Sequence, residues 1–495
     1  METAALHLDF EACDRARLAR DPRFDGRFFI AVKTTGIYCR PICPAPTSKQ
    51  CNVAYYPSAA AAAEAGFRPC LRCRPETAPG TPAWLGTSAT VRRALRLIHE
   101  GALDTESVEH LAARLGIGPR HLHRLFVQHL GASPLAVAQT RRLHFAKHLI
   151  DDTRLAMTDI ALASGFGSLR RFNDAFRNTY GRAPRDLRRA RRGEIVMDDA
   201  LRLRLAYRPP YDWAALRDFL GVRAIPGVER VDEDSYARSV SVGGKQGWIE
   251  VRPAPKVDAL ELAVHGLGAE SLFGVVSRVR QMFDLTADPA DIRGILKKDP
   301  LLTPLMRRCP GLRVPGAWDG FEIAVRAVLG QQVSVAAART FATRIVAAYG
   351  TPLSSPIEGI THLFPSPEIM ARADLSKIGL TGARAKTLNA LATAVQSGKV
   401  DFADAEGLRT ALVGVPGIGS WTAEYVAMRG LSDPDAFPAG DLVLQRMVGV
   451  TKRLTEKQLL ARAEQWRPWR AYAVLHLWRE ASNSTPVRSK ARKQA

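Results

Sequence analysis

A chain of 495 residues is too long for one hydrophobic core, since single cores stop growing at about 250 to 300 residues, so several domains are expected. Apolar residues make up 46% of the sequence and charged residues 24%, a globular composition that excludes a disordered or fibrous chain. The 70 Lys and Arg residues exceed the 49 Asp and Glu residues and leave a formal charge of +21. This excess predicts a polyanionic partner such as nucleic acid, with a solvated basic surface as the alternative.

The chain has no run of about 18 apolar residues and no charged start followed by an apolar segment. Neither a membrane span nor an export signal is therefore predicted. We expect no membrane partner and a cytoplasmic, nucleoid-associated location. In such a reducing compartment, clustered cysteines bind metal or react more often than they form disulfides.

Five of the seven cysteines lie within residues 38–76. Cys39 and Cys43 are four positions apart, Cys70 and Cys73 are three apart, and 27 positions separate the two pairs. Paired soft ligands on two turns are what tetrahedral Zn²⁺ coordination requires. The spacing leaves a structural zinc clamp and a reactive zinc thiolate open as alternatives, and a disulfide is the least favoured option.

Residues 10 to 76, which contain "DPRFDGRFFIAVKTTGIYCRPICPA" and "NVAYYPSAAAAAEAGFRPCLRCRPE", resemble the amino-terminal domain of the Ada family. The resemblance implies that four thiolates bind one Zn²⁺ and that one of them takes a methyl group from a DNA methylphosphotriester. Methyl transfer would remove one negative charge and so increase the affinity for DNA. Cys51 is extra to this set, and a buried small hydrophobic side chain is favoured for it over an incidental thiol or a group that supports the metal ligands. Cys39 in "GIYCRP" matches the methyl acceptor, and the remaining ligands would be Cys43, Cys70 and Cys73.

Short amphipathic helices are predicted from Val91 to about Arg192, with a Gly-containing turn, "LGIG" or "GFGS", inside each of two similar units. The second helix of each unit is basic and suits the major groove of DNA, whereas a helical bundle with exposed charge is the alternative. The two units resemble the AraC-type activator domain, which implies promoter DNA and RNA polymerase as partners. The candidate DNA readers are Arg120, Arg124, Arg170 and Arg171, together with His121 and Asn173.

The pattern changes after Ile195 to strand-like segments, "LRLRLAY", "ARSVSVG" and "WIEVRP", which predict a small mixed region that ends near His265. Helical segments return from about Ser271 and include a glycine-rich turn in residues 412–431. Such a hairpin points backbone N–H groups and a helix N-terminus at a DNA phosphate. The hairpin glycines are Gly414, Gly417 and Gly419.

The hairpin and the segment "FPAGDLVLQR" after it resemble the helix-hairpin-helix DNA glycosylases, in which an aspartate stabilises the cationic sugar as the base leaves. Asp441 matches that aspartate, and helix capping is the alternative role for it. Trp421 stands where strand-cleaving members place a Schiff-base lysine, so simple hydrolysis that leaves an abasic site is expected.

Residues 200 to about 480 resemble the AlkA family of 3-methyladenine DNA glycosylases in particular, through "YRPPYDW", "SYARSVSVG", "FEIAVRAVLGQQVSVAAA" and "WRPWRAYAVLHLW". The resemblance places Trp421, Tyr425 and Trp478 on the walls of a pocket for a flipped, cationic base, with core packing as the alternative. It also puts Gln332 where AlkA inserts a leucine into the duplex, so an amide replaces the apolar wedge.

We expect a multidomain, mainly α-helical protein with α+β parts that acts in DNA alkylation repair and in the adaptive response. It would be a monofunctional DNA-3-methyladenine glycosylase with one additional stoichiometric methyl transfer, and its partner would be double-stranded DNA. A pure DNA-binding regulator with an inactive glycosylase-like module is the alternative. The expected domains are a zinc and methyl-acceptor domain (1–80), an AraC-type helix-turn-helix domain (88–192), an AlkA N-terminal-like α+β domain (195–268), a helix-hairpin-helix glycosylase domain (269–485) and a basic tail (486–495).

Overall fold

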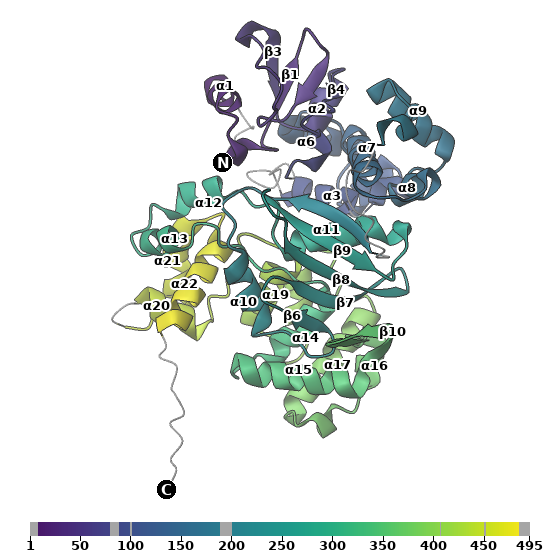
Figure 1. The fold of residues 1–495 in the computed structure, drawn as a ribbon. Helices are drawn as coiled ribbons and strands as arrows, with labels where there is room; N and C mark the ends of the chain where they lie inside the picture. The colour runs from purple at the N-terminus through teal and green to yellow at the C-terminus, as the bar shows by residue number, and fades with distance from the viewer. Residues whose placement is uncertain are drawn as a thin grey trace.

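The structure is a computed structural model in which a front half, residues 8–188, packs against a rear half, residues 200–484 (Figure 1). None of the helices in the described part of the chain is long and apolar enough to cross a membrane. The expected basic tail (486–495) lies outside the described residues. So do the segments 81–87 and 193–194, which would separate the expected zinc, helix-turn-helix and α+β domains. The described residues are 8–79, 89–99, 101–188, 200–405, 407–449 and 452–484.

A four-stranded sheet in the order β3-β1-β2-β4 forms the start of the front half. β1 pairs antiparallel with β2 and β3, whereas β2 pairs parallel with β4. In the parallel ladder Tyr38 is the partner of Pro69, so Cys39 and Cys70 leave the sheet next to each other. The elements are α1 (Phe10–Leu18), β1 (Phe29–Val32), β2 (Ile37–Cys39), β3 (Val53–Tyr56), α2 (Ala59–Glu64) and β4 (Arg68–Pro69).

Successive side chains of β1 point to opposite faces of this sheet, as the pleat of a strand requires. Ile30 packs in one cluster with Cys13 of α1, and Phe29 packs in another with Ala59 of α2. A helix therefore covers each face of the small sheet.

Two helix-turn-helix units follow and are joined by the long helix α7 (Pro134–Asp152). The turn of each unit contains a glycine with a positive φ, +69° at Gly116 and +78° at Gly165, where other residues would be strained. The basic helix of the first unit begins at Pro119, as the sequence predicts. The other helices are α3 (Ala89–His99), α4 (Ala102–Thr105), α5 (Val108–Arg114), α6 (Pro119–Leu130), α8 (Met157–Ala163) and α9 (Leu169–Tyr180).

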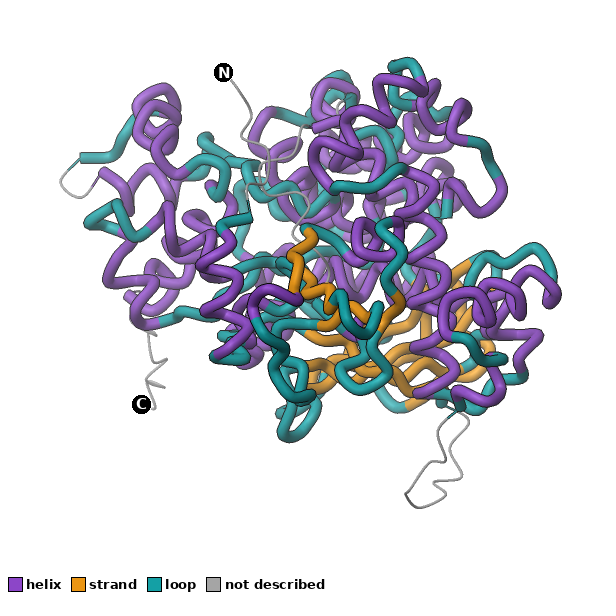
Figure 2. The backbone as a smooth tube through the Cα atoms, turned by 90° about the horizontal axis from the view of Figure 1, so that it is seen from above, coloured by secondary structure: helices purple, strands orange, loops and turns teal. Residues whose placement is uncertain are grey.

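The rear half begins with a five-stranded antiparallel sheet in the order β5-β9-β8-β7-β6, and Figure 2 shows strands gathered beside the helices. The strand-like segments predicted from the sequence correspond to β5, β7 and β8. The elements are β5 (Leu201–Ala206), α10 (Trp213–Gly221), β6 (Glu229–Val231), β7 (Tyr236–Val242), β8 (Lys245–Pro253), β9 (Ala259–His265) and α11 (Leu272–Met282).

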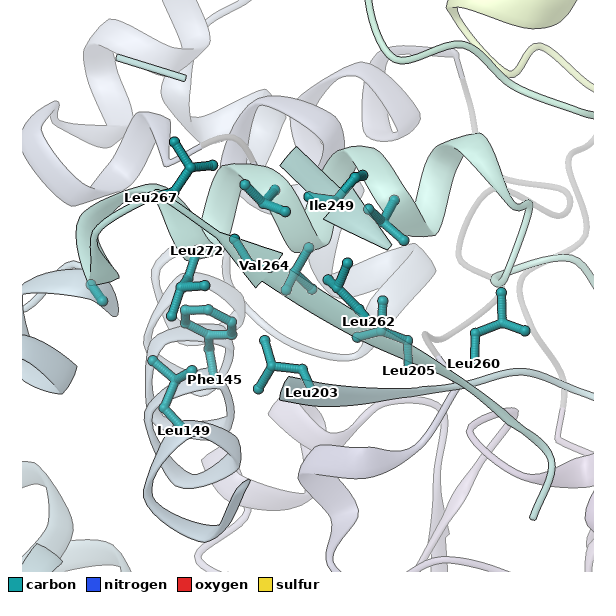
Figure 3. Packing of buried hydrophobic residues seen from close by; sticks show 14 of the residues in the cluster. Phe145, Leu149, Leu203, Leu205, Ile249, Leu260, Leu262, Val264, Leu267 and Leu272 are labelled. Atoms are coloured by element: carbon teal, nitrogen blue, oxygen red, sulfur yellow. The ribbon is translucent and has the colours of Figure 1, made fainter. Parts of the chain in front are cut away.

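The interior of the second helix-turn-helix unit continues into the rear half. One cluster of buried side chains contains Phe145 and Leu149 of α7 together with Leu203 of β5, Leu262 of β9 and Leu272 of α11 (Figure 3). The first unit instead closes on its own cluster, which runs from α3 to the start of α7. Because burial of apolar surface drives packing, the shared core joins the two halves of the molecule.

Helices and one two-stranded antiparallel sheet form the rest of the rear half, and Tyr425 packs against both of the buried clusters that the helices make. Tyr425 therefore lies at the interface between two groups of helices. The elements are α12 (Pro289–Leu296), α13 (Leu302–Arg308), α14 (Gly320–Leu329), α15 (Val335–Tyr349), β10 (Thr351–Ile357), β11 (Ile360–Leu363), α16 (Pro367–Arg372), α17 (Gly382–Gln396), α18 (Leu408–Val413), α19 (Ser420–Gly430), α20 (Leu442–Gly449), α21 (Glu456–Ala463) and α22 (Arg470–Ser484).

Candidate metal centre and candidate active site

Four cysteines come together at the edge of the front sheet. The sulfur atoms of Cys39, Cys43, Cys70 and Cys73 all lie within 4.8 Å of one another. Tetrahedral Zn²⁺ with Zn–S bonds of about 2.3 Å would hold four sulfur atoms about 3.8 Å apart, so the cluster needs little adjustment to take the ion. The two cysteine pairs predicted from the sequence thus form one centre.

The four thiols differ in exposure and in hydrogen bonding. Cys70 and Cys73 are buried, and each accepts a backbone N–H, from Arg72 at 3.4 Å and from Arg40 at 3.3 Å respectively. Cys39 and Cys43 are both half-buried; Cys43 accepts the backbone N–H of Ala45, whereas among the described residues no backbone N–H donates to the sulfur atom of Cys39. A thiolate without such a donor keeps more of its charge and nucleophilicity.

Hydrogen bonds among the thiols shift their acidity in opposite directions. The bond with Cys39 lowers the pKa of Cys43 to about 7, and bonds with Cys43 and Cys70 raise the pKa of Cys39. A bound metal requires deprotonated sulfur at every ligand, so this sharing of protons belongs to the metal-free centre.

The prediction that Cys51 is buried is wrong. Cys51 lies in a 3₁₀ turn, Gln50–Asn52, that enters β3, and this turn leaves its side chain exposed. Cys13 is buried in the cluster under α1, and burial raises its pKa to about 11, so it remains a neutral thiol.

The candidate DNA readers lie on the exposed faces of α6 and α9. Among them, the guanidinium of Arg124 lies 2.8 Å from the Nδ1 atom of His121, and all of these side chains are exposed except that of Asn173, which is half-buried. Exposed basic side chains on the second helix of each unit are what contact with a DNA groove requires. These residues are Arg120, Arg124, Arg170 and Arg171.

The glycine-rich turn connects α18 and α19, as predicted. Gly417 has a φ of +87°, and a Cβ atom there would lie 2.1 Å from the Oγ1 atom of Thr387. Glycine is therefore required at this point for conformational and for steric reasons. Gly414 has a helical φ of −68° and has no such conformational need, while Gly419 begins α19 without a side-chain cap.

A cavity of about 910 Å³ opens between the hairpin, the turn after α14 and helix α22. Seven candidate residues predicted from separate segments of the sequence are among those that line it. They are Gln332, Gly417, Gly419, Trp421, Tyr425, Asp441 and Trp478.

The carboxylate of Asp441 is held at this cavity by four N–H groups. Its Oδ2 atom accepts a hydrogen bond from Nε1 of Trp421 at 3.1 Å, and its Oδ1 atom accepts one from Nε1 of Trp478 at 3.3 Å. Oδ1 also accepts the backbone N–H groups of Val443 at 2.9 Å and Leu444 at 3.0 Å. Asp441 therefore caps α20 and faces the cavity at once, and its donors stabilise a negative charge there.

Three aromatic rings line the same cavity. Trp421 stacks on Tyr425 with ring centroids 5.4 Å apart, and Tyr425 lies 6.1 Å from Trp478 at a tilt of 43°. Each tryptophan exposes part of its ring to the cavity rather than filling a core, so core packing alone does not explain them.

Two arginines behind Tyr425, Arg429 and Arg223, were not predicted from the sequence. Arg429 is buried, donates to the backbone oxygen atoms of Pro315 and Gly316, and donates to the Tyr425 hydroxyl at 2.9 Å. Burial alone would raise the pKa of Tyr425, but Arg429 and then Arg223 outweigh it and lower that pKa. The chain contains many arginines, and no local sequence pattern distinguishes these two as residues of the site.

The four domain families match in sequence order. They are the metal binding domain of Ada at residues 12–76, a helix-turn-helix domain at 111–190, the AlkA N-terminal domain at 202–319 and the HhH-GPD superfamily of base excision DNA repair proteins at 325–471.

Curated relatives cover either the whole chain or its rear half. A probable bifunctional transcriptional activator/DNA repair enzyme AlkA from Mycobacterium tuberculosis (strain CDC 1551 / Oshkosh) is 42% identical over 483 residues, which are 96% of this chain and 97% of the relative. DNA-3-methyladenine glycosylase 2 of Escherichia coli (strain K12) is 38% identical over 285 residues, 55% of this chain and 95% of that protein. The solved 3-methyladenine DNA glycosylase from Archaeoglobus fulgidus is similar in fold over 57% of this chain and 99% of its own, with a TM-score of 0.51 and 20% identity.

Proposed function

Because the chain belongs to the family of bifunctional transcriptional activators and DNA repair enzymes of the AlkA type, we propose that Cys39 accepts a methyl group while the rear cavity excises alkylated bases. The protein repairs alkylated DNA, regulates transcription and binds DNA, and it is a DNA-3-methyladenine glycosylase. Its cofactor is one Zn²⁺, for which the four-cysteine centre supplies the ligands.

The base-excision step is proposed to occur at Asp441. An alkylated base flipped out of the duplex would enter the cavity and stack on the aromatic rings, which favour an electron-poor, cationic ring. The bond between C1′ and the base nitrogen breaks, and its electron pair leaves with the base. The carboxylate of Asp441 stabilises the positive charge that develops on the sugar, and water then adds to C1′ and loses a proton.

The observation that carries this proposal is the pair of indole N–H groups that fix the Asp441 carboxylate in the wall of an aromatic cavity. The hairpin offers Trp421 where an amine would be needed for a covalent imine, so the product is an intact strand with an abasic site. The hairpin glycines and Gln332 would hold the phosphate and fill the space left by the flipped base.

Release of 3-methyladenine from a methylated duplex tests the proposal. The Asp441→Asn variant keeps the size of the side chain and one acceptor for the cap but loses the charge, so release should fall at least 100-fold, as for other lost charge-stabilising groups. Equal release by this variant, or none by the unaltered protein, would support the alternative of a regulator with an inactive module.

Methyl transfer is proposed for Cys39 because it is half-buried and, unlike the equally half-buried Cys43, which accepts the backbone N–H of Ala45, its sulfur atom accepts no backbone N–H among the described residues. Zn²⁺ keeps the cysteines deprotonated at neutral pH. The Cys39 sulfur atom would attack the methyl carbon of a phosphotriester, an S–C bond would form, the C–O bond would break, and the phosphodiester would leave with the electron pair. The centre then carries one negative charge fewer and repels DNA less.

Mass spectrometry after incubation with methylphosphotriester DNA tests this step. We expect one added methyl group, on Cys39, and none in the Cys39→Ser variant. A methyl group on Cys43 would contradict the role proposed for Cys39, and no methyl group at all would leave a purely structural zinc site. Promoter recognition by Arg120, Arg124, Arg170 and Arg171, and contact with RNA polymerase, complete the proposed activator role.

A further inference from the structure

Gln332 stands in a conformation that its residue type disfavours. It lies in the turn between α14 and α15, its side chain is exposed, and its φ is +55°. Residues other than glycine adopt this left-handed region rarely, and they keep it only where neighbouring structure imposes it. Some contact must therefore hold this turn in place.

The neighbouring residue Gln331 supplies that contact. Its Nε2 atom donates to the backbone oxygen of Gly417 at 3.1 Å and to Oγ1 of Thr422 at 3.0 Å. Its own backbone oxygen accepts a hydrogen bond from Nη2 of Arg384 at 2.6 Å. Because the backbone oxygen of Gly417 can only accept a hydrogen bond, the side-chain amide of Gln331 must direct its nitrogen atom toward the hairpin.

These contacts tie together three parts of the candidate active site. Gly417 belongs to the hairpin, Thr422 follows the cavity residue Trp421, and Gln331 precedes Gln332. The Gln331 amide therefore spans the turn, the hairpin and the cavity wall.

We propose that Gln331 is a positioning residue that holds Gln332 in register with the hairpin and the cavity, so that filling the duplex gap and capturing the flipped base occur together. This role rests on the proposed function of Gln332 and Asp441. A preorganised side chain loses less conformational freedom when it enters the duplex, and a loose turn would lower the fraction of protein ready to hold a flipped base.

The Gln331→Leu variant keeps the approximate size of the side chain and removes its donors. Single-turnover release of the base should slow about tenfold, a change of about 1.4 kcal/mol, on a duplex with a pyrimidine opposite the lesion. Most of the rate should return on a duplex with a stable abasic analogue opposite the lesion, because no orphan base then needs support. If the variant only destabilised the fold, release of the base would slow equally on both duplexes.

Gln281→Leu is the matched control. Gln281 also donates from Nε2 to a backbone oxygen, that of Gly430 at 2.9 Å, but it does not line the cavity. This variant should lose comparable thermal stability and show no difference between the two substrates. The same substrate dependence in Gln281→Leu would overturn the inference.

A double variant provides the second test. Glycine adopts a positive φ without strain, so in a Gln332→Gly background the turn no longer needs the clamp. Adding Gln331→Leu to that background should cost little further rate, and a full additional tenfold loss would contradict the positioning role. If Asp441→Asn releases base as fast as the unaltered protein, the proposed function itself fails; if only Gln331→Leu is without effect, this inference alone fails.

Discussion

The four-cysteine centre and the base cavity belong to one chain but are built in different ways. The centre draws its sulfur atoms from residues 39–73, where two strand ends and two turns position them. The cavity draws its walls from residues as far apart as Leu220 and Ser482. A metal ion stabilises a small domain without a large core, whereas the cavity depends on the packing of whole helices. The two regions should therefore respond differently to the loss of one side chain.

The largest effect is expected at the zinc centre. Cys70→Ser removes a buried ligand, and because structural Zn²⁺ contributes on the order of 10 kcal/mol to the folding of small domains, the front sheet should unfold locally. Zinc content, measured by atomic emission, should fall from about one ion per chain to none, whereas release of alkylated base should persist. Cys51→Ser alters only an exposed thiol and should leave zinc content unchanged. Full zinc occupancy in Cys70→Ser would contradict the four-ligand centre.

The second effect concerns the core that joins the two regions. Phe145 is buried, and its ring lies 5.0 Å from that of Phe273. Phe145→Ala should lower the free energy of unfolding by about 3 to 5 kcal/mol and should reduce hydrogen-exchange protection in both α7 and β5. Leu122→Ala, in the separate core of the first helix-turn-helix unit, should reduce protection there and leave β5 unaffected. Unchanged protection of β5 in Phe145→Ala would mean that the halves fold independently.

A smaller effect is expected inside the cavity. Trp478→Phe retains an aromatic ring near Tyr425 but removes the N–H that donates to Asp441. A hydrogen bond to a charged group contributes about 1.5 to 3 kcal/mol, so base release should slow by about 10- to 150-fold while methyl uptake by the front end stays unchanged. The control is Trp248→Phe, since Trp248 stacks on His265 of the sheet and does not line the cavity. Equal slowing in both variants would argue against a specific role for the indole N–H.

The smallest effect is a pH dependence of the rear half. Burial raises the pKa of Asp284 to about 6, above its ordinary value near 3.8, and its carboxylate accepts a hydrogen bond from the Tyr472 hydroxyl of α22 at 2.9 Å. The folded state therefore binds this proton more tightly. The stability that the proton contributes is fully present below about pH 3.8 and is lost as the pH rises through about 6.

The contribution of this carboxyl group to the free energy of unfolding should be about 1 kcal/mol smaller at pH 8 than at pH 5. Denaturant titration of the unaltered protein and of Asp284→Asn across that range measures the difference. The variant should lack this contribution, and identical pH profiles would show that Asp284 does not titrate in the folded state.

Much of the candidate site follows from local sequence. The spacing of Cys39, Cys43, Cys70 and Cys73 indicates a metal site because paired ligands on turns need only short segments. Asp441 was expected to act either as a helix cap or as a catalytic group, and the structure shows the cap and the cavity position together. The buried position expected for Cys51 is wrong because the side-chain direction in a 3₁₀ turn depends on how the turn enters its strand.

The remainder depended on contacts between distant residues. Gln331 meets Thr422 across 91 positions, and Arg429 meets the backbone of Pro315 across 114 positions. Neither contact leaves a pattern within its own segment. The contact between Phe145 of α7 and Leu203 of β5 likewise cannot be predicted from the sequence. An apolar face of α7 could pack in a helical bundle as well as against a sheet.

The sequence by itself determined the types of the elements and the chemical classes of both sites. Hydrophobic periodicity, turn glycines and paired cysteines act over a few residues, where covalent geometry limits the choices. Only the tertiary structure decided which helix faces the five-stranded sheet, which thiols accept a backbone N–H and which amide holds Gln332 in its strained turn. Those outcomes depend on the packing of surfaces that the chain order does not place next to each other.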